Sequence, residues 1–253
     1  MSLSIPIEIR PQPNETTCGP SCLDAVYRYW DVSVEGSHPL DTIEQLPGGG
    51  TLAVQLAIDA LRRGMEATIT TFNLHLFDPT WFRHQSEASF GEHLADKLRR
   101  QLVIKRDDPT VDAVRLGRST KAYIEFLQLG GQVRMQPFEE TVISRPLAHG
   151  LPILCGLSST YLYQEARERE SESEPGKFKP DDTGGFPSGH FVVLHGYDAS
   201  SGEVEIADPL HDNPFSSSHQ YRASFHKLAT AILLGIVTYD ANLLVIAPAG
   251  SPL

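Results

Sequence analysis

The chain has 253 residues, enough to bury a core without disulfide or metal support in one large or two small domains. Hydrophobic residues make up 40% and charged residues 21%, which excludes a wholly disordered chain, a collagen-like repeat and a disulfide scaffold. The formal net charge of −11 argues against nucleic acid or an anionic membrane as the main partner, because both require a basic surface.

The three cysteines are few and odd in number, which predicts free thiols and favours a reducing compartment. The first 14 residues contain prolines and charges but no apolar stretch of signal-peptide length. The most apolar run, residues 229–236, is too short to cross a bilayer. We therefore expect a soluble, cytoplasmic protein without nucleic-acid or membrane partners; its oligomeric state is not predicted.

The N-terminal part predicts two helices and a strand. Apolar residues recur at helical spacing over residues 18–30, which predicts the first helix. A second helix is predicted over residues 51–63, with Thr51 as its N-cap and Gly64 as its terminator. The alternating pattern at residues 67–72 predicts the strand that follows.

The middle of the chain predicts further helices over residues 90–103 and 120–129, then a short strand over residues 132–135. The order helix, glycine, strand thus occurs twice, at residues 51–72 and 120–135. Two examples are too few to define a repeat. The segment at about residues 72–120 is rich enough in aromatic residues to pack as an insertion rather than a linker. We therefore expect a single domain over residues 1–253 that is enlarged by this insertion. The aromatic residues interpreted as core are Trp81, Phe82 and Phe90.

The C-terminal half predicts mainly strands. Residues 152–157 form a continuous apolar run, which is typical of a strand buried on both faces. Further strands are predicted over residues 191–197, 204–207 and 243–247, and a helix over residues 224–234.

A long polar segment, residues 158–188, separates the first two of these strands. Within residues 165–182 it carries seven acidic and four basic side chains. Its prolines and glycines predict that it forms no regular element. We interpret it as a solvated loop. A lid or a substrate-selecting role is the alternative, because the segment ends close to His190.

Cys18 is the strongest candidate nucleophile. It lies where a loop enters a helix, and the positive end of the helix dipole favours a thiolate there. Gly19 follows it and lets a substrate backbone approach the sulfur.

His190 and Asp208 complete a candidate triad with Cys18. His190 begins one predicted strand and Asp208 ends the next, so pairing of these strands would bring both to the same edge of the sheet. Gln12 precedes Cys18 by six residues, and its side-chain amide could join the Cys18 backbone N–H to stabilise an oxyanion.

These residues resemble the papain-like clan of cysteine peptidases, in particular the C39 and C39-like families. The resemblance rests on Gln12, on Cys18-Gly19-Pro20, and on residues 189–198 and 204–209. It implies an α+β, papain-like cysteine proteinase fold, in which an N-terminal helix carrying the cysteine packs on an antiparallel sheet, here with a helical insertion. The roles that it implies match the residues: Cys18 is the nucleophile, His190 the base, Asp208 the orienting acid and Gln12 the oxyanion amide.

The resemblance implies a thiol hydrolase, namely a cysteine peptidase, isopeptidase or amidase, that acts on a peptide or amide substrate without a cofactor. Cleavage after a double-glycine leader does not carry over, because the domains that perform it sit on a membrane transporter. One alternative is an acyltransferase, transglutaminase-like or phytochelatin-synthase-like, that uses the same triad. Another is a catalytically silent peptide-binding module. The acidic charge favours cationic substrates.

Other interpretations of these residues stay open. Cys18 also fits a buried structural cysteine. A zinc site would combine the triad residues with Cys22. His195 is the alternative base, but its odd offset from His190 on a strand directs it to the opposite face. Three residues are interpreted as structural: Cys22 in the core face of its helix, Cys155 in a strand core, and Asp24 as a capping or solvated helix residue.

Overall fold

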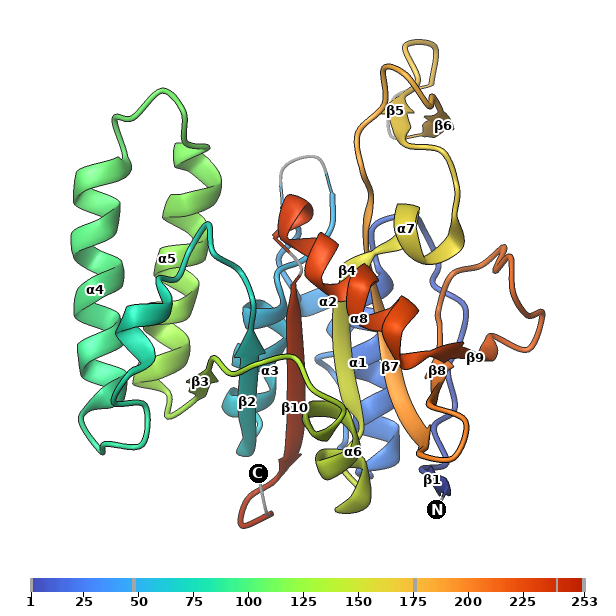
Figure 1. The fold of residues 1–253 in the computed structure, drawn as a ribbon, viewed down its shortest axis with the longest axis horizontal. Helices are drawn as coiled ribbons and strands as arrows, with labels where there is room; N and C mark the ends of the chain where they lie inside the picture. The colour runs from blue at the N-terminus through green and yellow to red at the C-terminus, as the bar shows by residue number, and fades with distance from the viewer. Residues whose placement is uncertain (1, 47–48, 175–176, 240, 252–253) are drawn as a thin grey trace.

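The computed structural model describes residues 2–46, 49–174, 177–239 and 241–251 (Figure 1). Its strands are β1 (Ser2–Ser4), β2 (Met65–Thr71), β3 (Gln132–Arg134), β4 (Ile153–Ser158), β5 (Glu168–Glu170), β6 (Phe178–Pro180), β7 (Gly189–Asp198), β8 (Glu203–Ala207), β9 (Gln220–Ser224) and β10 (Asn242–Pro248). Its α-helices are α1 (Cys18–Tyr29), α2 (Pro39–Thr42), α3 (Ala53–Arg62), α4 (Phe90–Lys105), α5 (Ala113–Gln128), α6 (Thr141–Ala148), α7 (Ser159–Tyr163) and α8 (Phe225–Leu234). Two 3₁₀ helices are η1 (Pro79–Phe82) and η2 (Gly235–Thr238).

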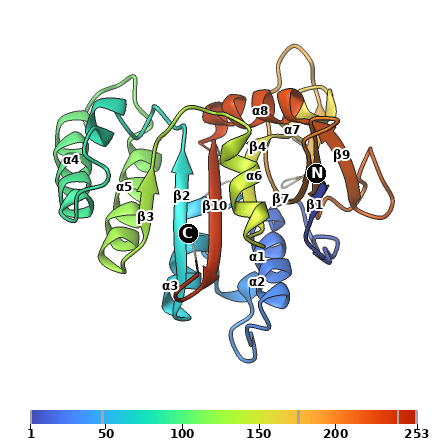
Figure 2. The ribbon, with the colours of Figure 1, turned by 60° about the horizontal axis from the view of Figure 1, so that its bottom comes forward.

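One large sheet organises the molecule. Its strand order is β3-β2-β10-β4-β7-β8-β9, and β1 pairs with β7 off this path. All its pairs are antiparallel except β2 with β3. Helices cover both faces, with α1 and α3 on one and α6 and α8 on the other (Figure 2). The protein is therefore of the mixed α+β class predicted from its sequence, with a mostly antiparallel sheet.

The predicted helices and strands are present, and most of their ends shift by no more than two residues. The exception is α5, which begins at Ala113, seven residues before the predicted start. The continuous apolar run at residues 152–157 becomes β4, which lies between β10 and β7 and is buried along its whole length. The two helix–glycine–strand segments lie side by side, because α3 contacts α5 and β2 pairs with β3 in parallel. Gly64 and Gly130 end these helices with φ values of 79° and 93°, a conformation in which glycine is favoured.

The start of α3 corrects one prediction. Its N-cap is Leu52 rather than Thr51, and the backbone N–H of Leu52 donates to Oε1 of Gln55 at 3.1 Å. Gln55 lies in the first turn of α3, and its side chain accepts the N–H of the N-cap residue. The Thr51 hydroxyl therefore does not cap the helix. That hydroxyl is buried without a hydrogen-bond partner among the described residues.

The segment at residues 158–188 is more regular than predicted. It forms α7 and the two-stranded β5–β6 hairpin, which projects beyond the main sheet (Figure 1). Pro180 ends β6, and Gly184 and Gly185 follow it, so these residues limit the hairpin rather than prevent it. The other two predicted breakers, Pro175 and Gly176, lie outside the described residues.

The helical hairpin formed by α4 and α5 stands beside the β3 edge of the sheet (Figure 1). Its buried side chains, among them Leu94, Leu98 and Phe126, belong to the same apolar cluster as the core around the sheet. Phe82 and Phe90 are buried in this cluster and Trp81 packs partly against it, as predicted. The boundaries of the insertion stay a prediction.

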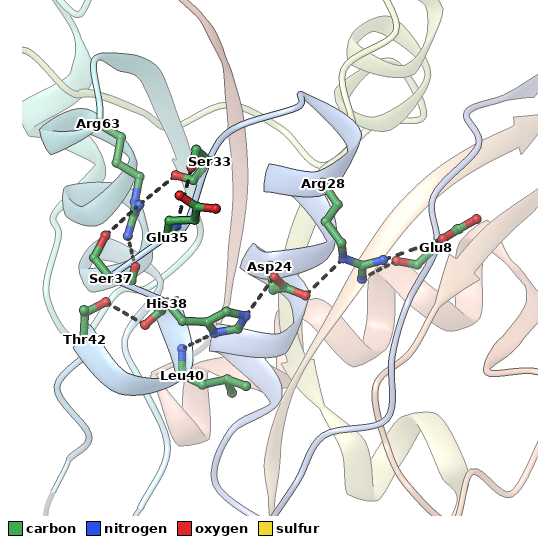
Figure 3. Close-up of polar contacts among 10 residues, drawn as sticks. All are labelled: Glu8, Asp24, Arg28, Ser33, Glu35, Ser37, His38, Leu40, Thr42 and Arg63. Carbon is green, nitrogen blue, oxygen red and sulfur yellow. Dashed lines mark hydrogen bonds and ion pairs between the residues drawn. The ribbon is translucent and has the colours of Figure 1, made fainter.

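A polar network links α1 to the N-terminal segment and to α2 (Figure 3). The position of Asp24 in this network differs from the prediction for that residue. Asp24 is buried, and its carboxylate lies 3.1 Å from Nε of Arg28 and 3.1 Å from Nε2 of His38. Arg28 also donates to the carbonyl oxygen of Glu8 at 2.8 Å. Asp24 therefore connects α1 to the N-cap of α2, and through Arg28 to the N-terminal segment; it is neither a cap nor solvated.

Among the described residues, no helix combines the length and apolar character required to span a membrane.

Candidate active site

Cys18 is the first residue of α1. The preceding residue, Thr17, is the N-cap, but its side chain accepts no capping hydrogen bond; its hydroxyl donates to the Asn14 carbonyl at 3.1 Å. The first turn also contains no acidic residue. The sulfur therefore lies at a helix N-terminus whose backbone N–H groups are not satisfied by a side-chain cap, where a negative charge is stabilised.

His190 and Asp208 are brought together by the pairing of β7 with β8. The register places Val193 opposite Ala207, so the start of β7 and the residue after β8 lie at one edge of the sheet, as predicted. His190 Nε2 lies 2.8 Å from Oδ1 of Asp208, and both side chains are buried.

The protonation of His190 depends on both Asp208 and Cys18. Burial opposes protonation of the imidazole, but the Asp208 carboxylate and the negative charge at Cys18, together with hydrogen bonds to both, raise the pKa of His190 to about 10. Since Nε2 faces Asp208, Nδ1 is the nitrogen available to the Cys18 sulfur. These interactions favour the protonated form of the imidazole.

Asp208 is held as a carboxylate by more than the imidazole. Burial opposes its ionisation, but His190 and several hydrogen bonds keep its pKa well below the usual range. Its Oδ2 accepts hydrogen bonds of 2.7 Å from the hydroxyls of Tyr163 and Tyr221. Its Oδ1 also accepts the backbone N–H of Leu210 at 2.9 Å.

Tyr163 and Tyr221 were not found by sequence reasoning. Tyr163 ends α7, inside the segment predicted to be irregular, and Tyr221 lies on β9, which was not predicted. Burial, followed by the charge of Asp208, raises the pKa of both phenols, so they remain hydrogen-bond donors. No sequence motif links either tyrosine to Asp208, and only the fold brings these residues together.

Gln12 borders the same space. Its backbone N–H donates to the Pro209 carbonyl at 2.7 Å, which ties the N-terminal segment to the residue after Asp208. Its side chain is buried, and Nε2 donates to the Asn14 carbonyl at 2.8 Å. An amide nitrogen carries two protons, so this bond leaves one for another acceptor.

A cavity of about 530 Å³ joins these residues to the β5–β6 hairpin. We call it the cleft; Gln12, Cys18 and His190 line one part of it, and Phe178 and Phe186 line another. Phe186 is 74% exposed, although it is a large apolar residue. The cleft carries four glutamates and two arginines: Glu15, Glu165, Glu168, Glu170, Arg115 and Arg169.

The remaining cysteines are core residues, as predicted. Cys22 and Cys155 are fully buried, and burial raises the pKa of both thiols. The Cys22 sulfur donates to the Phe191 carbonyl at 3.3 Å. All three cysteines are free thiols.

His195 lies away from the cleft, as its offset from His190 predicted. Its Nδ1 is 2.9 Å from the Ile5 carbonyl oxygen, and the ring borders a different cavity, with Ser4 and Glu205. Burial lowers its pKa, which favours the neutral imidazole. In the described ranges of the chain, no group of three or more histidine, cysteine, aspartate or glutamate residues is placed to hold a metal ion.

Comparison with known proteins agrees with the sequence resemblance. Residues 115–231 match the family described as the Peptidase_C39 like family. The matched range contains His190 and Asp208, whereas Gln12 and Cys18 precede it. No curated protein and no solved structure matches the chain. The resemblance to C39-like cysteine peptidases is thereby confirmed, and at the level of the family it supports a hydrolase of the cysteine-peptidase type.

Proposed function

We propose that the protein is a thiol hydrolase that cleaves a peptide or amide bond, with Cys18 as the nucleophile. One observation carries this proposal: the buried His190 ring lies between the Asp208 carboxylate and the Cys18 thiol, beside a cleft of about 530 Å³. A buried imidazole that bonds both a thiol and a carboxylate is the arrangement that activates a cysteine nucleophile.

In the first half of the reaction, His190 takes the thiol proton and the Cys18 sulfur attacks the substrate carbonyl carbon. The Cys18 backbone N–H and the second Nε2 proton of Gln12 donate to the oxyanion that forms. The tetrahedral intermediate then collapses to a thioester, and the leaving amine departs with the proton from His190.

In the second half, His190 removes a proton from water, which attacks the thioester carbonyl. The acid is released, and the proton returns to the Cys18 sulfur through His190. Asp208 keeps the imidazole oriented and stabilises its charged form throughout, as the third member of a triad does.

The charge of the cleft supports a substrate class. Four glutamates line it against two arginines, and Arg169 already pairs with Asp181 at 3.6 Å. The chain as a whole carries a net charge of −11. We therefore include a preference for basic peptides or amides in the proposal, because an acidic cleft attracts cations.

Alkylation tests the nucleophile without a known substrate. We expect iodoacetamide to modify Cys18 at pH 6, because an imidazolium–thiolate pair reacts at a pH where an ordinary thiol barely does. Cys22 and Cys155 are internal controls that should stay unmodified, since both are buried with raised pKa values. The measurement is the modified fraction of each cysteine peptide by mass spectrometry between pH 5 and pH 9.

The variant His190→Ala should lose the labelling at pH 6 and regain it only above about pH 8, near the pKa of a free thiol. Labelling of the unmodified protein that rises only above pH 8 would contradict the proposal and favour a silent binding module. Amines added during turnover of a peptide substrate separate hydrolysis from acyl transfer, because a transferase would yield the amine adduct.

The fold also supports two wider proposals. The chain is a single domain enlarged by an insertion at about residues 72–120, since the α4–α5 hairpin shares the core of the sheet. The protein works in the cytoplasm, where the three free thiols stay reduced.

A further inference from the structure

A second cavity lies between α6 and strands β2 and β10 of the sheet. Helix α6 covers the sheet face opposite the one on which α1 lies (Figure 2). Its volume is about 350 Å³, at the small end of the range for ligand pockets. Thr68 and Thr70 of β2, with their cross-strand partners Val245 and Leu243 of β10, line it from the sheet. It shares no lining residue with the cleft that contains Cys18.

The ionisable side chains that line this cavity are all of basic type. Arg134, Arg145 and His149 line it, and no acidic residue does. Arg145 forms no ion pair within the described residues, and the Arg134 guanidinium donates only to Oε1 of Gln132, at 3.0 Å. In a chain with a net charge of −11, two guanidinium groups without a carboxylate partner at one cavity indicate a site for an anion.

An unsatisfied hydroxyl supports the same conclusion independently. Thr68 is only 5% exposed, and its Oγ1 is buried without a hydrogen-bond partner among the described residues. A buried hydroxyl without a partner destabilises the fold, so such groups are rare in native proteins. Because Thr68 lines the cavity, an acceptor atom of a bound molecule would satisfy it.

The rest of the lining requires an apolar group on that molecule. Val142 and Pro146 of α6, Leu151, and Leu243 and Val245 of β10 contribute aliphatic surface. A fully hydrated inorganic anion would leave this surface without a partner. A carboxylate with a short aliphatic group fits both the basic and the apolar part of the lining.

We propose that this cavity binds a small organic carboxylate with an aliphatic side group. The Arg134 and Arg145 guanidinium groups hold the carboxylate, the Thr68 hydroxyl donates to an oxygen of the ligand, and the aliphatic lining covers the rest. Either the C-terminus of a peptide or a free short-chain acid carries this chemistry. The site is separate from the proposed thiol hydrolase centre and does not depend on it.

Calorimetry on the full chain tests the proposal with four probes: N-acetyl-leucine, 4-methylpentanoate, N-acetyl-leucinamide and inorganic phosphate. We expect at least one of the two carboxylates to bind, and the neutral amide to bind at least about tenfold more weakly, because it lacks the charge-assisted bonds. Stronger binding of N-acetyl-leucine indicates a peptide C-terminus as the ligand, and stronger binding of 4-methylpentanoate indicates a free acid. Absence of carboxylate binding, or equal binding of amide or phosphate, overturns the proposal.

Two variants and a matched control locate the binding. Arg145→Gln should weaken carboxylate binding by about tenfold or more, and because Arg145 is exposed the fold should be retained. Arg99→Gln, on the exposed face of α4, removes the same charge elsewhere and should leave affinity unchanged. An equal loss in both variants would mean attraction by net charge and would overturn the site.

Thr68→Val separates binding from folding. The new methyl group replaces a hydroxyl that has no partner in the fold, so the melting temperature should stay the same or rise while carboxylate affinity falls several-fold. Unchanged carboxylate affinity in Thr68→Val would contradict the proposed hydrogen bond from Thr68 to the ligand. Saturating N-acetyl-leucine should also leave the alkylation rate of Cys18 unchanged, whereas protection of Cys18 would place the ligand in the cleft and overturn the proposal.

Discussion

At the scale of single residues, Asp208 is a carboxylate buried among several hydrogen-bond donors. It accepts hydrogen bonds from His190, Leu210 and two tyrosines. These donors offset the loss of hydration that burial imposes on a carboxylate. The carboxylate that we propose orients the imidazole is therefore itself held by several hydrogen-bond donors.

The two tyrosine hydroxyls provide a test of this arrangement. Tyr221→Phe should destabilise the fold by about 1–3 kcal/mol, because it removes a buried hydrogen bond to a charged group. It should also slow Cys18 alkylation at pH 6, since a less firmly held Asp208 stabilises the imidazolium less. Chemical denaturation and the alkylation rate measure the two effects.

Tyr161→Phe is the matched control, because Tyr161 is only partly buried and its hydroxyl forms no bond to Asp208. It should change neither quantity. If Tyr221→Phe left the alkylation rate of Cys18 unaltered, the tyrosine would have only a structural role.

At the scale of elements, the β5–β6 hairpin and the loop after it border the cleft that Cys18 and His190 line. Phe178 and Phe186 expose apolar surface there, which a folded chain does not need for its own stability. The sequence predicted either a solvated loop or a substrate-selecting segment at residues 158–188. The position of these rings supports the second of these as a hypothesis.

Phe186→Ala is expected to raise KM for peptide substrates several-fold, because the ring offers substrate contact area, and to leave kcat nearly unchanged. Its effect on the free energy of unfolding should stay within about 0.5 kcal/mol, since the side chain is 74% exposed. Ile104→Ala on α4 is the control, because Ile104 is similarly exposed at 78% but does not line the cleft. Equal KM values for both variants would exclude Phe186 from substrate binding.

At the scale of the whole molecule, the buried His190–Asp208 pair couples stability to pH. The pKa of Asp208 lies below its ordinary value of 3.8, so its contribution is present above pH 3.8 and is lost as pH falls further. The pKa of His190 is raised from 6.5 to about 10, so its contribution is present below pH 6.5 and is lost as pH rises towards 10.

The double variant His190→Gln/Asp208→Asn removes both charges without leaving one of them buried alone. The melting temperature of the wild-type protein should exceed that of this variant by the largest amount between about pH 4 and pH 6.5. The difference should shrink on both sides of this window. If the plots of melting temperature against pH for the two proteins ran parallel from pH 3 to pH 10, the pair would not make stability depend on pH.

Much of the fold was predictable from local patterns. The apolar run of β4 and the helical spacing in α1 and α8 depend on which residues face the core, and this information is local. The elements that were missed or misread carry weak local signals. Strand β9 has one buried residue in five, and β5 and β6 have only three residues each.

The sequence by itself indicated the four candidate residues Gln12, Cys18, His190 and Asp208. The last three stand at or next to the ends of recognisable elements, and Gln12 lies six residues before Cys18. Only the tertiary structure decided what surrounds them. The tyrosine donors on Asp208, the hairpin beside Cys18 and the basic cavity around Thr68 all join segments far apart in the chain. Contacts of this kind depend on strand pairing and packing over long sequence separations, which no local pattern encodes.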